Sequence, residues 1–211
     1  MIMNVKFLIF EKGVRKLRKA SMESNGRQIQ FGLIIILFLS SLIVPVILLY
    51  PIQEILYRPN EFYYFAPYFN AYIIFMVSLF VMALVLLINY LIIPKTKKRK
   101  NIKRGLVSTS LLIALGFIAL SFNTYKWIDS RGIHMNPFFS LKVNFVEWEE
   151  IVKVEQVNLE KSGVTKPDHL VFTFQDGSTI EEPLAGNMVL AKNYIANELK
   201  QRGLTIENVY K

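Results

Sequence analysis

The sequence contains no cysteine and only two histidines among its 211 residues. Without cysteine, the chain cannot form disulfides, bind iron–sulfur clusters, ligate zinc through thiolates or use a thiolate in catalysis. A metal site would require His134 and His169 to converge with a carboxylate such as Asp168 or Glu155, and nothing in their spacing requires it. We therefore expect both histidines to be structural or surface residues, and we predict no metal site.

The sequence also lacks the common catalytic and nucleotide-binding motifs, since it has no GxSxG, HExxH, Walker A or GxGxxG pattern in a suitable context. Glu147, Glu149 and Glu150 surround Trp148 and could suggest paired carboxylates. Beside a strand, however, such charges are more often solvated or protect a sheet edge. We predict a non-enzymatic protein that has no catalytic residues and needs no cofactor.

Charged residues are missing from three long apolar runs, residues 31–50, 71–93 and 105–122. A helix of twenty residues is about 30 Å long, which matches the hydrocarbon core of a bilayer, and roughly eighteen residues can just cross it. The sequence therefore predicts a transmembrane region over residues 31–122 with three transmembrane helices. Carriers of ions or protons generally need ionisable groups at depth, so a transporter made of these three helices alone is not expected.

A basic cluster lies between the second and third runs, in residues 94–104. It holds seven basic residues and no acidic one: Lys95, Lys97, Lys98, Arg99, Lys100, Lys103 and Arg104. Moving such a cluster across a bilayer is costly, so we expect this loop to stay cytoplasmic. Each cation near an anionic leaflet contributes about 1 kcal/mol of attraction. We predict that these seven residues, the basic anchor, bind anionic lipid headgroups at the membrane surface.

The formal net charge of +9 is unevenly distributed along the chain. Residues 1–30 carry seven Lys and Arg against two Glu, whereas residues 122–211 carry ten basic residues against twelve acidic ones. The basicity therefore lies beside the apolar runs, which argues against nucleic-acid binding. Apolar residues recur at helical spacing before residue 20, and the pattern ends at Ser21–Gly26. Residues 1–30 thus fit either a basic amphipathic segment in the headgroup region or a solvated basic tail.

The distribution of Lys and Arg predicts a multi-pass protein of the cell membrane with a cytoplasmic N-terminus and a cytoplasmic 94–104 loop. Three crossings would place residues 123–211 outside the cytoplasm. If residues 105–122 do not cross, residues 123–211 return to the cytoplasm, and the sequence leaves both arrangements open. Residues 51–70 hold seven aromatic rings, which we expect to form a belt at the membrane interface; an aromatic ligand cage is the alternative.

The apolar alternation in residues 123–211 predicts several strands followed by one helix. Strands are expected at 125–129, 133–136, 138–145, 150–160, 170–174 and 178–184, with turns at Ser130-Arg131-Gly132 and Asp176-Gly177. The alternation slips near Glu155–Gln156, as a β-bulge would cause. Residues 187–202 form an amphipathic helix that Asn187 can cap and that Gly203 follows.

Three stretches, Tyr125–Ile133, Val146–Val154 and Leu170–Ile180, together with the terminal helix, resemble the bacterial pleckstrin-homology-like (PH-like) domains found in small membrane proteins. The resemblance covers residues 123–211 only. It implies a small, strongly bent antiparallel sheet closed by one C-terminal helix, with Trp148 as a core anchor. Phosphoinositide-binding members of the wider fold use clustered Lys and Arg in the first hairpin. This chain has few basic residues there, so inositide binding is not expected.

The predicted fold class is therefore a membrane protein with three transmembrane α-helices followed by a small α+β domain. We expect that domain to be an interaction or sensing module that is held at the bilayer and binds a protein partner. The alternative is an accessory subunit of a membrane transporter or membrane enzyme complex. In that case the helices would do the packing, with Ser110 and Ala114 as a close helix contact.

Overall fold

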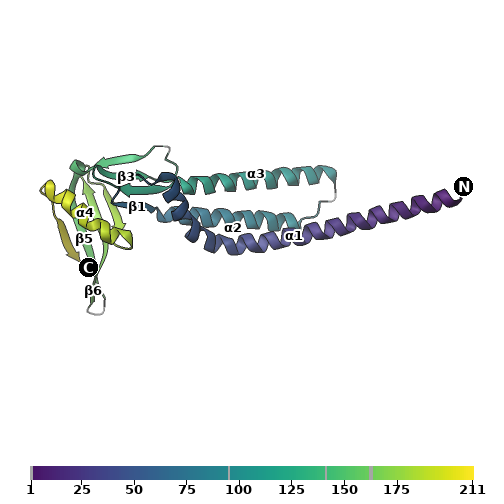
Figure 1. Cartoon of the computed structure of the whole chain (residues 1–211), viewed down its shortest axis with the longest axis horizontal. Helices are drawn as coiled ribbons and strands as arrows, with labels where there is room; N and C mark the ends of the chain where they lie inside the picture. Colours follow the sequence, from purple (N-terminus) through teal and green to yellow (C-terminus); the bar gives the residue numbers. More distant parts are fainter. Residues whose placement is uncertain (1, 95, 141, 162–163) are drawn as a thin grey trace. The chain divides into compact units, whose positions relative to one another are not determined.

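The computed structural model describes residues 2–94, 96–140, 142–161 and 164–211 (Figure 1). The side chains of residues 1–24, on which the amphipathic prediction rests, lie outside the described part of the chain. The chain divides into two compact units. We call Met1–Leu48 with Tyr72–Ser121 the helical unit, and Leu49–Ala71 with Phe122–Lys211 the sheet module.

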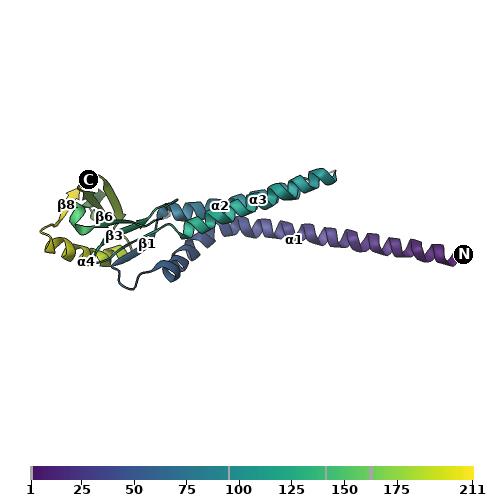
Figure 2. The same ribbon diagram turned by 90° about the horizontal axis from the view of Figure 1, so that it is seen from above.

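The described residues contain three long helices, which are labelled in Figure 2: α1 (Ile2–Tyr57), α2 (Phe69–Leu91) and α3 (Lys97–Phe122). All three are long and apolar enough to cross a membrane, which confirms that part of the prediction. Helices α1 and α3 begin well before their predicted apolar runs, whereas α2 begins and ends two residues earlier than its run. Helix α1 continues through Ser21–Gly26 without a break. The helices leave many large apolar side chains uncovered, as expected of surfaces that face lipid.

Side-chain contacts hold α1 and α2 together as an antiparallel pair within the helical unit. Phe38 contacts Phe80 with ring centroids 5.3 Å apart, and Phe31 contacts Tyr90 at 5.8 Å. The Gln30 side-chain amide donates a hydrogen bond of 3.1 Å to the carbonyl of Leu86 on α2. Such a polar contact is favourable among apolar helices, where few other hydrogen-bond partners exist.

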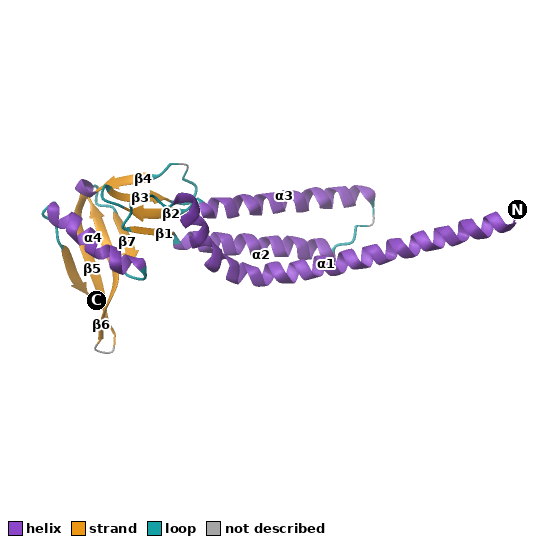
Figure 3. Cartoon of the chain, in the orientation of Figure 1, coloured by secondary structure: helices purple, strands orange, loops and turns teal. Residues whose placement is uncertain are grey.

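The sheet module contains two four-stranded sheets, seen as orange arrows in Figure 3. The first, sheet A, has the order β1 (Tyr64–Pro67), β2 (Tyr125–Ile128), β3 (Gly132–Asn136) and β4 (Asn144–Glu147), and all its pairs are antiparallel. Its edge strand β1 precedes α2 in the sequence, whereas its neighbour β2 follows α3. The short 3₁₀ helix η1 (Trp148–Glu150) connects sheet A to the second sheet.

The second sheet, sheet B, has the order β7 (Thr179–Pro183), β6 (Val164–Phe174), β5 (Ile151–Lys161) and β8 (Ile206–Tyr210). Its strands pair antiparallel except β5 and β8, which are parallel. The β5–β6 register is irregular at Val157/Asn158, one residue after the predicted bulge.

The core of the module is built by α4 (Asn187–Gln201) against strands of sheet B, with additions from sheet A. One face of α4 is fully buried: Met188, Ala191, Ile195 and Leu199. Trp148 is also fully buried, as predicted, and its indole N–H donates a 3.1 Å hydrogen bond to the Asp129 carbonyl. Gly203 follows the helix at φ 77°, a left-handed conformation that glycine adopts at low cost, and thereby ends α4 as predicted.

Several sequence predictions differ from this fold. The module is not confined to residues 123–211, because β1 belongs to sheet A. Within residues 123–211, strand β8 follows the helix that was expected to be the last element. Of the strand predicted over 138–145, residues 138–140, 142 and 143 lie in no strand, since β4 begins only at Asn144. Gly186, not Asn187, occupies the position before α4, and no side chain caps the helix there.

The 51–70 aromatic segment also differs from the predicted interfacial belt. Four of its residues form β1, and the side chain of Phe65 in this strand is buried, with only 2% exposed. Tyr57 stacks on Tyr125 of β2 with centroids 4.5 Å apart, and Tyr63 stacks on Tyr194 of α4 at 5.1 Å. Phe69 is 78% exposed and keeps the character expected of an interfacial ring. The aromatic residues are therefore mainly packing groups of the sheet module.

Candidate functional site

The basic anchor lies at the start of α3, except that Lys95 is outside the described residues. Five of its members are exposed: Lys97, Lys98, Arg99, Lys100 and Arg104. Lys103 is half-buried, and its ammonium group donates hydrogen bonds to the carbonyls of Asn89 and Ile92. These carbonyls lie at the C-terminal end of α2, where backbone acceptors have no partner within the helix and a cation is favoured by the helix dipole. Lys103 therefore connects α2 to α3, whereas the other described members of the basic anchor have exposed side chains.

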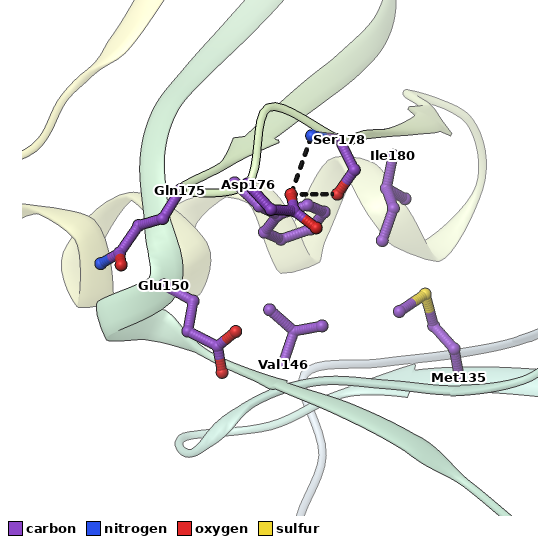
Figure 4. A pocket seen from close by; sticks show the side chains of 8 residues that line it. Met135, Val146, Glu150, Gln175, Asp176, Ser178 and Ile180 are labelled. Atoms are coloured by element: carbon purple, nitrogen blue, oxygen red, sulfur yellow. Dashed lines mark hydrogen bonds between the residues drawn. The ribbon is translucent and has the colours of Figure 1, made fainter.

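A cleft between the two sheets is a concave site of the module with both apolar and charged lining groups (Figure 4). Its volume is about 440 Å³, within the range of small-molecule and side-chain pockets. The lining residues are Met135, Val146, Glu150, Phe174, Gln175, Asp176, Ser178 and Ile180. Figure 4 shows Asp176, Ser178 and Ile180 on one side, facing Glu150, Val146 and Met135 on the other. We call this site the inter-sheet cleft.

The turn between β6 and β7 is fixed against η1 at the rim of the inter-sheet cleft. The backbone N–H of Gln175 donates to the Glu150 carbonyl at 2.9 Å, and the Gln175 side chain donates to the Glu149 carbonyl at 3.0 Å. Asp176 accepts hydrogen bonds from the Ser178 hydroxyl and backbone N–H, at 2.6 and 2.8 Å. These bonds hold the pKa of Asp176 below its ordinary value, so its carboxylate is charged at neutral pH.

The chemistry of the inter-sheet cleft follows from its two kinds of lining group. Met135, Val146 and Ile180 provide apolar walls, whereas Glu150 and Asp176 bring two carboxyl groups to the rim. An aliphatic chain that ends in a cation satisfies both parts, because its stem covers the apolar wall while its charge meets the carboxylates. Lysine and arginine side chains have this form.

A buried ion pair lies elsewhere in the module and links the two sheets. Lys126 of β2 donates to Glu182 of β7, and the two residues are 9% and 1% exposed. The Lys126 ammonium also lies 4.9 Å from the centre of the Tyr68 ring. Burial raises the pKa of Glu182, an effect that Lys126 opposes, and burial together with the Glu182 charge raises the pKa of Tyr68 to about 12. The two side chains bind each other and do not line the inter-sheet cleft, so we assign this pair a structural role.

The two histidines lie in different environments. His134 is 6% exposed and stacks between Trp127 and Phe145, with ring centroids at 4.3 and 4.4 Å. Its Nε2 atom lies 3.0 Å from an Asp129 carboxylate oxygen, and burial lowers the pKa of His134. His169 is a strand residue whose Nδ1 lies 2.7 Å from Asp168. Within the described residues, no three His, Asp or Glu side chains gather as a metal site would require.

No protein-family model, curated protein or solved structure matches the chain. The inter-sheet cleft therefore has to be interpreted from its own geometry. Sequence reasoning identified Asp176-Gly177 as a turn and Glu150 as a solvated charge, and it did not bring them together. Their proximity follows from the β5–β6 register, in which Ile151 pairs with Phe174, and apolar alternation within single strands does not encode such a pairing.

Proposed function

We propose that the chain is a non-enzymatic, multi-pass membrane protein whose sheet module recognises a protein partner. The partner would place a lysine or arginine side chain in the inter-sheet cleft. The observation that carries this proposal is the pairing of apolar walls with Glu150 and Asp176 in a cleft of about 440 Å³. The acidic balance of residues 122–211, ten basic against twelve acidic residues, also favours a cationic partner segment over an anionic one.

Binding of a defined peptide tests this proposal. The full-length protein in nanodiscs is titrated with a fluorescent amphipathic peptide that has one central lysine, and with the same peptide carrying acetyllysine, which has no charge. We expect saturable binding of the lysine peptide and at least severalfold weaker binding of the acetylated one. Equal binding of the two peptides, or no saturable binding, would refute the role of the cleft.

Two variants localise the interaction. Asp176→Asn removes the charge but keeps the oxygen that accepts from Ser178, and Glu150→Gln removes the second charge. Both should reduce the preference for lysine over acetyllysine. Glu207→Gln is the matched control, because Glu207 is an exposed carboxylate on β8 and does not line the cleft. If the control reduces the preference equally, general charge attraction explains the binding and the cleft does not.

We further propose that the N-terminus and the 94–104 loop are cytoplasmic and that the sheet module is outside the cytoplasm. The β1–β2 pairing supports this arrangement, since it joins residues before α2 to residues after α3 in one sheet, with Pro67 opposite Tyr125. The segment before α2 and the segment after α3 must then lie on the same side of the membrane. If α1 and α2 cross, α3 has to cross as well, which disfavours the arrangement in which residues 105–122 fail to span.

Cysteine labelling tests the orientation, because the native chain contains no cysteine to interfere. In intact cells, an impermeant thiol reagent should label Ser130→Cys, at the exposed β2–β3 turn, but should label Lys98→Cys only after lysis. The reverse pattern would invert the proposed topology. The exposed part of the basic anchor would then no longer face the anionic cytoplasmic leaflet on which its lipid contact depends.

The PH-like resemblance remains a prediction for the sheet module. The antiparallel strands before α4 and the fully buried Trp148 are compatible with it, whereas β1 and the parallel strand β8 lie outside the expected plan. The accessory-subunit alternative gains less support from the structure. Ala114 is 3% exposed within the helical unit, so the small-residue contact predicted for a partner helix is already covered by this chain.

A further inference from the structure

The loop between β3 and β4 carries two aromatic residues, the half-buried Phe138 and the exposed Phe139, and Phe139 has an unusual backbone conformation. Phe139 is 67% exposed and has φ 66°, the left-handed region, which bulky side chains seldom adopt. Among the described non-glycine residues, it alone has a positive φ. Phe138 and Phe139 lie together, with ring centroids 4.2 Å apart and planes tilted by 54°. Strained positions of this kind often mark functional surfaces.

The strand register places this loop at the end of sheet A where the chain joins its apolar helices. Tyr125 pairs with Pro67 on one side and with Asn136 on the other, so these three residues form one end of the sheet. Pro67 stands two residues before the start of α2 at Phe69, and Tyr125 stands three residues after the end of α3 at Phe122. Pro137, Phe138 and Phe139 directly follow Asn136 in the chain.

A hydrogen bond ties the loop to the same boundary. The Asn136 side-chain amide donates to the carbonyl of Asn123 at 2.7 Å, and Asn123 is the first residue after α3. Sheet A extends from this end toward the β2–β3 turn at Ser130. Phe138 and Phe139 follow Asn136 by two and three residues, so they lie at the end of sheet A that adjoins the end of α3. This is the end at which α3 would emerge from a bilayer.

Polar groups of Pro137, Ser140 and Lys142 are hydrogen-bonded to one another, which suits them to an environment with little water. The backbone N–H of Ser140 donates to the Pro137 carbonyl at 3.0 Å, which closes a tight turn. The Ser140 hydroxyl donates to the Lys142 carbonyl and accepts from the Lys142 N–H at 3.3 Å. Backbone groups satisfied in this way can enter the boundary between headgroups and acyl chains at low cost. Lys142 is exposed and offers a cation to lipid phosphates at that depth.

We propose that Phe138 and Phe139 insert into the headgroup–acyl boundary of the same membrane that α1, α2 and α3 cross. The two rings would form an additional lipid contact that holds the sheet module against the bilayer surface, as aromatic side chains do at membrane interfaces. This inference rests on the proposed membrane insertion and does not depend on what occupies the inter-sheet cleft.

Nitroxide labelling of the full chain in nanodiscs of phosphatidylcholine and phosphatidylglycerol tests the proposal. Val143→Cys places a label in the loop while both phenylalanines remain, and collisions with oxygen, which partitions into lipid, are compared with collisions with a water-soluble nickel complex. Ser130→Cys, at the opposite end of sheet A, is the aqueous reference. Leu112→Cys is the lipid reference, because Leu112 is 68% exposed on α3.

We expect the oxygen-to-nickel ratio at residue 143 to be several-fold higher than at residue 130 and close to that at residue 112. In the Val143→Cys background, Phe138→Ser with Phe139→Ser should lower the ratio at 143 toward the aqueous reference. Val189→Ser with Leu190→Ser removes two exposed apolar side chains from α4, 53% and 69% exposed, and should leave the ratio unchanged.

Three outcomes would overturn the inference. A lipid-like ratio at 112 with an aqueous ratio at 143 would mean that the helices insert and the loop does not. Protection of residue 143 from both reagents would mean that the loop is covered by protein, such as a second copy of the chain. An aqueous ratio at 112 would remove the proposed membrane insertion and the loop contact together, and it therefore identifies a failure at the earlier step.

Discussion

The buried Lys126–Glu182 pair gives the sharpest test of how the two sheets are held together. Lys126→Met keeps most of the side-chain volume and removes the cation. It leaves Glu182 at 1% exposure with its only described hydrogen-bond donor gone. Removing one partner of a buried ion pair typically costs about 3–5 kcal/mol, because the other charge stays desolvated. We expect a loss of this size in the free energy of unfolding of the sheet module.

The loss should depend on pH in a defined direction. Burial already raises the pKa of Glu182, and Lys126 opposes that rise. Without Lys126 the carboxyl should bind a proton more readily in the folded state than its ordinary value of 4.5 allows. A raised folded-state pKa stabilises the fold at low pH, and this contribution disappears as the pH rises through it. Lys126→Met should therefore be most destabilising at neutral pH, and adding Glu182→Gln should recover part of the loss.

Tryptophan fluorescence in the full-length protein measures this effect selectively. The chain has two tryptophans, Trp127 and Trp148, and both lie in sheet-module segments. A loss of 3 kcal/mol corresponds to a fall in the midpoint of thermal unfolding of at least about 10 °C for a unit of this size.

Lys153→Met is the matched control for the same chemical change. Lys153 pairs with Glu155 at 2.7 Å, but its side chain is 44% exposed, and surface pairs contribute only about 0–1 kcal/mol. Equal, small effects of Lys126→Met and Lys153→Met at neutral pH would refute the idea that the buried pair links the sheets energetically.

Two further predictions concern sheet A. Gly132→Ala should disrupt β3–β4 pairing, because a Cβ at residue 132 would lie 2.1 Å from the carbonyl oxygen of Val146. In Gly177→Ala the new Cβ meets no atom within 4 Å, so the variant should lose only the roughly 1–2 kcal/mol of left-handed strain at φ 82°. The unfolding midpoint of Gly132→Ala should therefore be the lower of the two. Burial lowers the pKa of His134, so the module should lose stability as the pH falls below the ordinary histidine pKa of 6.5. The loss should be no more than about 1.4 kcal/mol per pH unit. His134→Phe should abolish this dependence when unfolding is measured as a function of pH. Burial raises the pKa of Asp129, but bonds from Arg131 and His134 outweigh it, so that this pKa is also lowered. A second loss of stability should follow below pH 3.8, and it should be smaller in His134→Phe, which keeps only the bonds from Arg131.

The parts of the fold that sequence reasoning predicted are those encoded within one stretch of chain. The apolar runs predicted α1, α2 and α3, because hydrophobic length alone decides whether a helix can span a membrane. The spacing of Met188, Ala191, Ile195 and Leu199 predicted the buried face of α4, and Gly203 predicted its end. The Asp176-Gly177 turn likewise follows from two adjacent residues.

The parts that sequence reasoning missed depend on partners that are distant in the chain. Strand β1 is four residues long, and its aromatic composition suits an interface as well as a strand, so its pairing with β2 had no local signal. Strand β8 follows α4 and pairs with β5 in parallel, an arrangement that alternation does not specify. Phe138 and Phe139 are apolar enough for a strand, but the left-handed conformation of Phe139 is incompatible with the extended backbone of a strand. The inter-sheet cleft was missed for the same reason, since its walls come from separate elements.

The position of β1 in the sequence means that the sheet module and the helices cannot be separated by a single cut. Residues 49–71 belong to the module, yet they comprise the end of α1, strand β1 and the start of α2. Sheet A gains its β1–β2 pairing only after α3 has been made. Removing residues 123–211 would leave Phe65, now 2% exposed, without the strand against which it packs. A loss of function after that deletion would therefore reflect both a missing module and an exposed aromatic segment. Replacing residues 1–48 and 72–121 with unrelated apolar helices, while keeping 49–71 and 122–211, is the exchange that separates the two candidate functions. Retained peptide binding would assign function to the sheet module, and its loss in a protein with native tryptophan fluorescence would assign it to the helices.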